Sequence, residues 1–150
     1  MTDKNEEDER TTDVGLFHYA NSFRKSAKAL NKAKVKATHP DAPVCFLFYH
    51  SIELYMKAYL RHSGYSVNEL RGLSHGFVKL GKAFEAKGGV LDDEDREILE
   101  LLDETGSFIR ARYIRTGAFT RPAEEALSRT TKSLHESVRE KLKSAGKPVR

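Results

Sequence analysis

Apolar residues recur at steps of three and four along most of this chain, which is the period of an amphipathic α-helix. The first such stripe consists of Leu16, Tyr19, Phe23, Ala27, Leu30 and Ala33. By this criterion the sequence predicts helices over residues 13–36, 42–62, 74–87, 92–116 and 122–143. No stretch shows the alternation of a β-strand. The expected fold is therefore all-α, a compact bundle of about five helices.

The second predicted helix is apolar on nearly every side. A thin polar line follows it at steps of three and four, formed by His50, Glu53, Lys57 and Arg61. A helix of this kind lies at the centre of a domain or in a subunit interface. Glu53 and Lys57 in the middle of the segment argue against a membrane span. Their spacing of four residues predicts a structural ion pair.

The two ends of the chain differ from this pattern in composition. Residues 1–12 are acidic and poor in apolar side chains, and residues 144–150 contain a glycine and a proline. We expect a disordered acidic N-terminus over 1–12, a helical domain over 13–143 and a flexible tail over 144–150. The first residues do not resemble a secretory signal. The single cysteine, Cys45, lies in an apolar run, where a buried thiol is expected, so we expect a cytoplasmic protein.

The net charge of +4 is unevenly distributed. Residues 1–13 hold six acids and two bases, whereas the stretch from Arg24 to Lys36 holds six bases and no acid. A basic surface would suit a polyanion such as RNA. The alternative is a solvated helix face without a ligand.

Metal binding has little support in the sequence. His50 and Glu53 are three residues apart and could reach one ion, but no further histidine or cysteine is spaced to complete a site. The chain also has no glycine-rich phosphate loop and no serine elbow. We therefore predict no metal and no cofactor.

Three arginines lie close together near the end of the fourth predicted helix, at positions 110, 112 and 115. On a helix continued from Leu101, Arg112 and Arg115 prolong a stripe of apolar and small side chains, and a buried guanidinium requires a partner. Two interpretations remain open. In the first, an arginine pairs with Glu53 and fixes the helix register. In the second, Arg110, Arg112 and Arg115 face a cleft and hold phosphate.

Three short segments, in this order along the chain, resemble the HEPN-domain family. Residues 48–60, with the sequence FYHSIELYMKAYL, resemble the central helix of the family. Residues 73–80, LSHGFVKL, are similar to its third helix, and residues 109–115 resemble the arginine–tyrosine segment before its last helix. The resemblance covers roughly residues 15–142 and implies a bundle of four or five helices.

The resemblance also implies a range of functions. HEPN domains are often homodimers. Many are metal-independent endoribonucleases, often toxins of toxin–antitoxin pairs, and others are non-catalytic RNA- or nucleotide-binding modules beside a nucleotidyltransferase. Catalytic members carry an arginine followed, after four to six residues, by a histidine. No histidine stands at that distance after Arg110, Arg112 or Arg115.

One match to that spacing, Arg129 and His135, lies inside the last predicted helix. Six residues turn a helix by about 600°, so the two side chains should point to different faces. No general base is therefore assigned at the usual place. His50 and His75 are the remaining candidates.

We predict an RNA- or nucleotide-phosphate-binding module without ribonuclease chemistry of its own. As partners we expect a second copy of the chain and a nucleotidyltransferase or an antitoxin. One alternative is a metal-independent endoribonuclease that uses the three arginines with His50 or His75. The other is a protein-interaction module with no nucleic-acid role.

Overall fold

The computed structural model of the protein describes residues 8–73, 76–110 and 124–150, with the backbone alone for residues 105–110. These residues form helices and no strand, which confirms the all-α prediction. The labelled helices are α2 (Asp13–Ala33), α3 (Asp41–His62), α4 (Val67–Gly72), α5 (Phe77–Ala86), α6 (Asp93–Arg110) and α7 (Glu124–Ser144).

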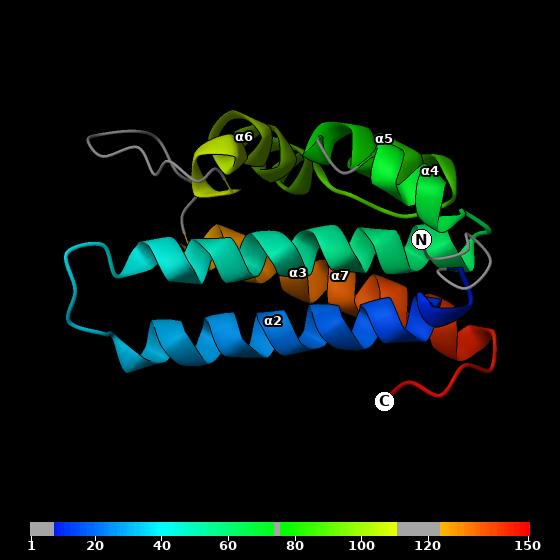
Figure 1. Cartoon of the computed structure of the whole chain (residues 1–150), viewed down its shortest axis with the longest axis horizontal. Helices are drawn as coiled ribbons and strands as arrows, with labels where there is room; N and C mark the ends of the chain where they lie inside the picture. The colour runs from blue at the N-terminus through cyan, green and yellow to red at the C-terminus, as the bar shows by residue number, and fades with distance from the viewer. Residues whose placement is uncertain (1–7, 74–75, 111–123) are drawn as a thin grey trace, which may run out of the picture.

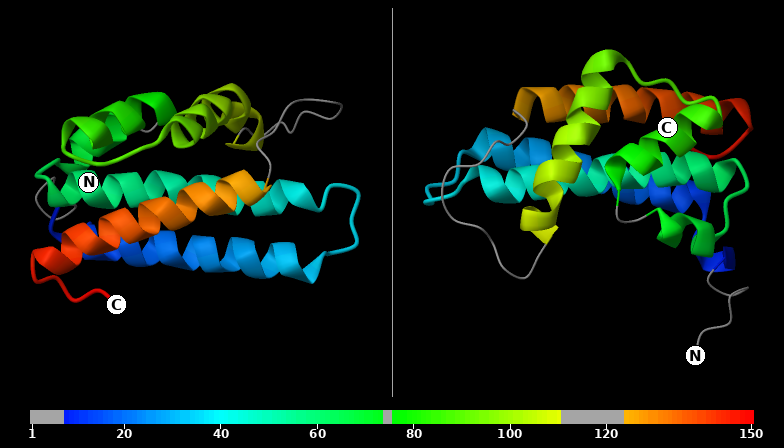
Figure 2. Two further views of the ribbon diagram at one scale, coloured as in Figure 1. Left: turned by 180° about the vertical axis from the view of Figure 1, so that it is seen from behind. Right: turned by 90° about the horizontal axis from the view of Figure 1, so that it is seen from above.

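Helix α3 is the centre of the bundle, as its apolar surface predicts. Helices α2 and α3 lie side by side, and α7 crosses the pair obliquely on one face (Figures 1 and 2). Helices α4, α5 and α6 lie along the opposite edge of α3 from α2 (Figure 1). The α3 side chains Tyr49, Ile52, Tyr55, Met56 and Leu60 are at most 1% exposed. Burial of such side chains from water stabilises each by about 1.5–3 kcal/mol.

The close packing of α5 on α6 depends on Gly81. A Cβ atom at this position would lie 2.5 Å from Leu99 Cδ1 on α6 and 3.3 Å from Leu91 Cδ1. Leu99 and Leu91 are 2% and 4% exposed and line a pocket together with Gly81, so an added Cβ would have to displace Leu99 or separate the helices. The absent side chain therefore sets how closely the two helices approach.

The helix boundaries differ from the prediction in three places, each for a local reason. Helix α2 ends at Ala33 rather than near residue 36, because Lys34 adopts a left-handed backbone conformation (φ 49°). The short helix α4 was not predicted; it begins with a capping box in which Ser66 and Glu69 bond each other's backbone N–H. In α5, the first described helical residue is Phe77, whose N–H donates to Asp103 Oδ1 of α6 at 2.6 Å.

The described residues at both chain ends contact the helical bundle. The Arg61 guanidinium donates to the carbonyl oxygens of Asp8 (2.7 Å), Thr11 (2.9 Å) and Tyr65 (2.9 Å). At the other end, Lys147 Nζ lies 3.6 Å from Asp13 Oδ2. Val149 packs against the core. Most of these contacts are made by backbone carbonyls. Such contacts cannot be predicted from the spacing of hydrophobic residues.

Candidate nucleic-acid interface

The arginines proposed to hold phosphate fall largely outside the described residues. Arg112, Arg115 and His75 lie in the segments that the structure does not describe, and Arg110 is the last residue of α6, described by its backbone alone. Their role in binding stays a prediction.

The polar line on α3 forms a compact side-chain cluster around Glu53. Glu53 is 7% exposed, and its Oε1 lies 3.2 Å from Lys57 Nζ. His50 Nδ1 lies 3.9 Å from Glu53 Oε2. The His50 ring stacks on Phe23 at 5.0 Å between centroids and meets the edge of Phe46 at 4.9 Å. Packing and a carboxylate thus surround His50, a setting that suits a structural role.

A second polar surface lies where α2 and α7 pack antiparallel, and we call it the cationic seam. It consists of Arg24, Lys25 and Lys28 on α2 and of Lys132, His135 and Arg139 on α7. The His135 ring stacks on Phe17 of α2 with centroids 5.5 Å apart, which places this side of α7 against α2. Lys132 and Arg139 stand three and four residues from His135 and therefore share its side of the helix.

Arg24 is the half-buried centre of the cationic seam. Within the described parts of the chain, its Nε is buried and makes no hydrogen bond, and no carboxylate pairs with it. The guanidinium lies beside the Tyr55 hydroxyl, which donates to Asn21 Oδ1. Burial raises the pKa of Tyr55 to about 12, although Arg24 acts in the opposite direction. Tyr55 therefore remains a neutral phenol at physiological pH and does not neutralise Arg24.

The imidazole of His135 responds to the same positive charges. Its pKa is lowered below the ordinary value of 6.5, first by burial and then by the charges of Arg24, Arg139 and Lys25. Glu136 acts in the opposite direction but does not reverse the shift. His135 is therefore neutral at pH 7, and the net charge of the seam comes from its lysines and arginines.

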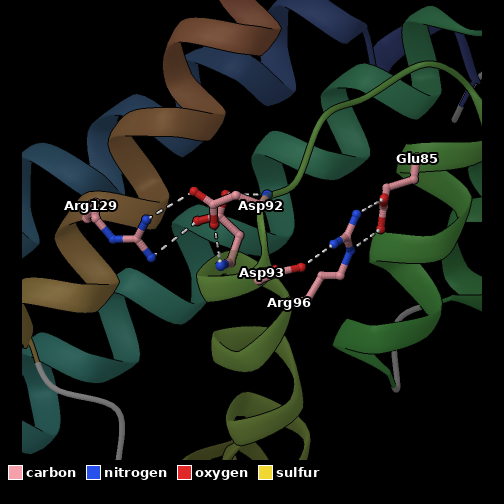
Figure 3. Close-up of polar contacts among 6 residues, drawn as sticks. Glu85, Asp92, Asp93, Arg96 and Arg129 are labelled. Carbon is pink, nitrogen blue, oxygen red and sulfur yellow. Dashed lines mark hydrogen bonds and ion pairs between the residues drawn. The ribbon is translucent and has the colours of Figure 1, made fainter.

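The arginines on the other side of the bundle are neutralised by acids. This acidic corner is formed by Glu85 of α5 and by Asp92, Asp93, Glu94 and Asp95 at the start of α6. Figure 3 shows Glu85, Asp92 and Asp93 with the two arginines. Arg129 of α7 lies 2.9 Å from Glu94 and 3.3 Å from Asp92. Arg96 lies 2.9 Å from both Glu85 and Asp93.

This corner also settles how Arg129 and His135 are placed. Arg129 faces the acids of α6, whereas His135 faces α2. The two side chains therefore point to different sides of α7, as their six-residue separation predicts.

The fold and the family comparison agree. The model of the HEPN domain family matches residues 14–141, which is most of the chain, and the protein belongs to the HEPN-domain family. Domains of this family commonly dimerise and bind RNA or nucleotides, and some are ribonucleases. No curated protein and no solved structure matches the chain.

No helix among residues 8–73, 76–110 and 124–150 is long and apolar enough to cross a membrane. The same ranges hold no group of three or more histidine, cysteine or carboxylate side chains placed to share a metal ion.

Sequence reasoning found half of the cationic seam. The run of bases without an acid on α2 was interpreted as a surface for a polyanion, with a solvated face as the alternative. The contribution of α7 was missed, because Lys132, His135 and Arg139 are dispersed among other residue types, Glu136 included. They become a basic group only when one side of the helix is selected. The spacing of three and four between them was the available signal.

Proposed function

We propose that this HEPN domain binds the phosphate groups of RNA or nucleotides at the cationic seam, without cleaving them. The observation that carries the proposal is Arg24: a half-buried guanidinium with a buried Nε and no carboxylate partner among the described residues. Lys25 and Arg139 lie close enough to affect the neighbouring His135 electrostatically.

The energetics favour an external anion at this position. Removing a charged group from water costs several kcal/mol unless a partner of opposite charge offsets it. Arg96 and Arg129 have such partners in the acidic corner. Arg24 instead lies beside the neutral Tyr55 hydroxyl, which carries no compensating charge. A phosphate would supply the missing charge and accept paired hydrogen bonds from the planar guanidinium.

The proposal extends to the undescribed arginines and to partner proteins. Arg110, Arg112 and Arg115 would add phosphate contacts. A homodimer, and a nucleotidyltransferase or antitoxin as partner protein, are part of the same proposal because HEPN domains are used in these settings. The genes adjacent to this one would identify such a partner.

One observation favours a second candidate function, metal-independent RNA cleavage. His135 is a neutral imidazole beside Arg24 and Arg139. In this reaction His135 would take the proton of a 2′-hydroxyl while that oxygen attacks phosphorus, Arg24 would stabilise the phosphate charge, and the 5′-oxygen would leave. His135 is packed on the rings of Phe17 and Tyr55, which restricts its approach to a substrate, so binding without cleavage is the first proposal.

Both candidate functions can be tested by fluorescence anisotropy with a labelled single-stranded RNA of about 12 nucleotides in the presence of a chelator. We expect binding by the wild type without cleavage. Arg24→Gln should weaken binding about tenfold, since a hydrogen bond to a charged group contributes about 1.5–3 kcal/mol. Arg129→Gln is the matched control, because it removes an arginine of the same helix bundle that acids already neutralise, and its affinity should equal that of the wild type.

Three other results would contradict the proposal in different ways. Cleavage that is lost in His135→Gln would establish the ribonuclease alternative. Binding that Arg24→Gln does not weaken would place the ligand elsewhere. No binding even at low salt would favour the protein-interaction module.

A further inference from the structure

We infer that the cationic seam takes a run of consecutive phosphates of one nucleic-acid strand, rather than a single nucleotide. This inference rests on the proposed function and deepens it by naming the class of ligand. It depends on a row of cations that continues from Arg24 along α2.

The row consists of Arg24, Lys28 and Lys32, which stand at steps of four residues on α2. An α-helix rises 1.5 Å per residue, so successive members are about 6 Å apart along the axis and the row is about 12 Å long. Lys28 and Lys32 are exposed, and neither has a carboxylate partner within the described ranges. All three charges are thus available to a ligand that lies along the helix.

No carboxylate interrupts this row. The sequence contains no aspartate or glutamate between Asp13, in the first turn of α2, and Asp41, where α3 begins. On the α7 side, Lys132 and Arg139 flank His135, and Glu136 is the acid that acts on the imidazole. The α2 side of the seam therefore carries positive charge alone, with Glu136 at the α7 border. Beyond Lys32 the row ends at a pocket that Asp41 and Glu124 line.

The length of the row distinguishes a strand from a nucleotide. Each cation of the row can pair with one phosphate of an unpaired strand that lies along the helix, so the row of about 12 Å engages about three successive phosphates. A mononucleotide presents its phosphates at one end and reaches Arg24 or the lysines, not the whole row. Because only a strand engages every cation, its affinity should increase with the number of nucleotides until the row is covered.

The dependence of affinity on length can be tested by competition against the labelled RNA. The competitors are ATP and oligouridylates of about 4, 8 and 12 nucleotides. We expect affinity to rise at least tenfold from the nucleotide to the longest strand. The slope of log affinity against log salt should become shallower by about 0.7 in Lys28→Gln and again in Lys32→Gln, because each phosphate contact on a single strand contributes about that amount. Lys79→Gln, which removes an exposed lysine on α5, should leave the slope unchanged.

Two further competitors identify the chemical class of the ligand. Oligodeoxyuridylate of equal length shares the phosphodiester backbone, so equal affinity supports a backbone-reading seam, and tighter RNA binding adds a contribution from the 2′-hydroxyl. Polyglutamate of similar charge should compete poorly. If it competes as well as RNA with the same dependence on Lys28, the ligand is an acidic protein and the inference is wrong.

The failures of the two proposals are distinguishable. If ATP binds as tightly as the longest strand and Arg24→Gln weakens both, phosphate binding stands and the extended strand is overturned. If Lys28→Gln and Lys32→Gln keep the wild-type salt slope, the row is not the path of the ligand. If neither ATP nor RNA binds, both proposals fail.

Discussion

The two sides of this bundle use the same residue types to opposite effect. In the acidic corner, Arg96 and Arg129 each lie 2.9 Å from a carboxylate that belongs to another helix. In the cationic seam, Arg24 and Arg139 lie near other positive charges. The corner is electrostatically complete and holds α5, α6 and α7 together. In the seam the positive charges have too few acids to balance them, as expected of a surface that binds an anionic ligand.

The largest effect should follow from damage to the corner. Asp95 is 1% exposed; its Oδ1 accepts from the Thr130 hydroxyl at 2.8 Å and its Oδ2 from the N–H of Asp92 at 3.2 Å. Asp95→Ala leaves both donors without an acceptor and should lower the free energy of unfolding by about 2 kcal/mol in urea titrations. Asp93→Ala, at a solvated position of the same turn, is the control and should cost under about 0.5 kcal/mol. Equal losses would mean that the corner has no structural role.

A carboxylate placed in the seam should make it resemble the corner. The substitution Lys28→Glu would put an acid four residues from Arg24 and supply the counter-charge that α2 lacks. We expect RNA affinity to fall at least about tenfold while the free energy of unfolding changes by no more than about 0.5 kcal/mol. Lys79→Glu on α5 changes the net charge equally and should have a much smaller effect on affinity. A similar loss in both variants would point to net charge rather than to the seam.

Removing one arginine of the corner should have a moderate, salt-sensitive effect. The Arg129 side chain is 38% exposed and its partners Asp92 and Glu94 are more exposed still. Arg129→Gln should therefore lower the free energy of unfolding by up to about 1 kcal/mol at low ionic strength, and the difference from wild type should shrink in about 1 M salt. Thermal melts at the two salt concentrations measure this. A loss that persists at high salt would indicate packing rather than charge.

The smallest effect concerns the protonation of His135. Because its pKa is lowered in the folded protein, the unfolded chain binds more protons, so this group makes the protein more stable as the pH rises toward and past 6.5. A bound phosphate favours the imidazolium, so RNA affinity should rise as the pH falls below 6.5. Titration of affinity and of melting temperature between about pH 5 and 8 should show both trends flattened in His135→Gln. An unchanged pH profile would remove His135 from the seam.

The fold was predictable where long, periodic segments determine it. The apolar surface of α3 predicted its central position. The predicted start of the fourth helix at residue 92 agrees with the structure, in which Asp92 Oδ1 caps α6 by accepting from Asp95 N–H at 2.8 Å. Helix α4, with six residues, is too short for a periodic signal. Its Ser66-x-x-Glu69 capping box was the available local signal.

The candidate site was less predictable because it depends on contacts between distant parts of the chain. Phe17 of α2 and His135 of α7 stack although they stand near opposite ends of the sequence. Neither local sequence indicates this contact. The same holds for Asp103, which caps α5 from α6. The arginines at 110, 112 and 115 could be singled out from composition and resemblance, but their surroundings are a tertiary property that lies outside the described side chains.

The missing side chain at Gly81 has a consequence for the arginine-bearing end of α6. Helix α6 continues about 16 Å beyond Leu99 to Arg110. An alanine at position 81 would press on Leu99 near the fixed end of this helix, where Asp92 and Asp95 hold it to α7 through Arg129 and Thr130. Asp103 also holds α6 to the first turn of α5, so a tilt at Leu99 would strain the bonds from Phe77 and Val78 before it moved residue 110. The absent side chain at Gly81 thus helps to fix the direction in which the far end of α6 points.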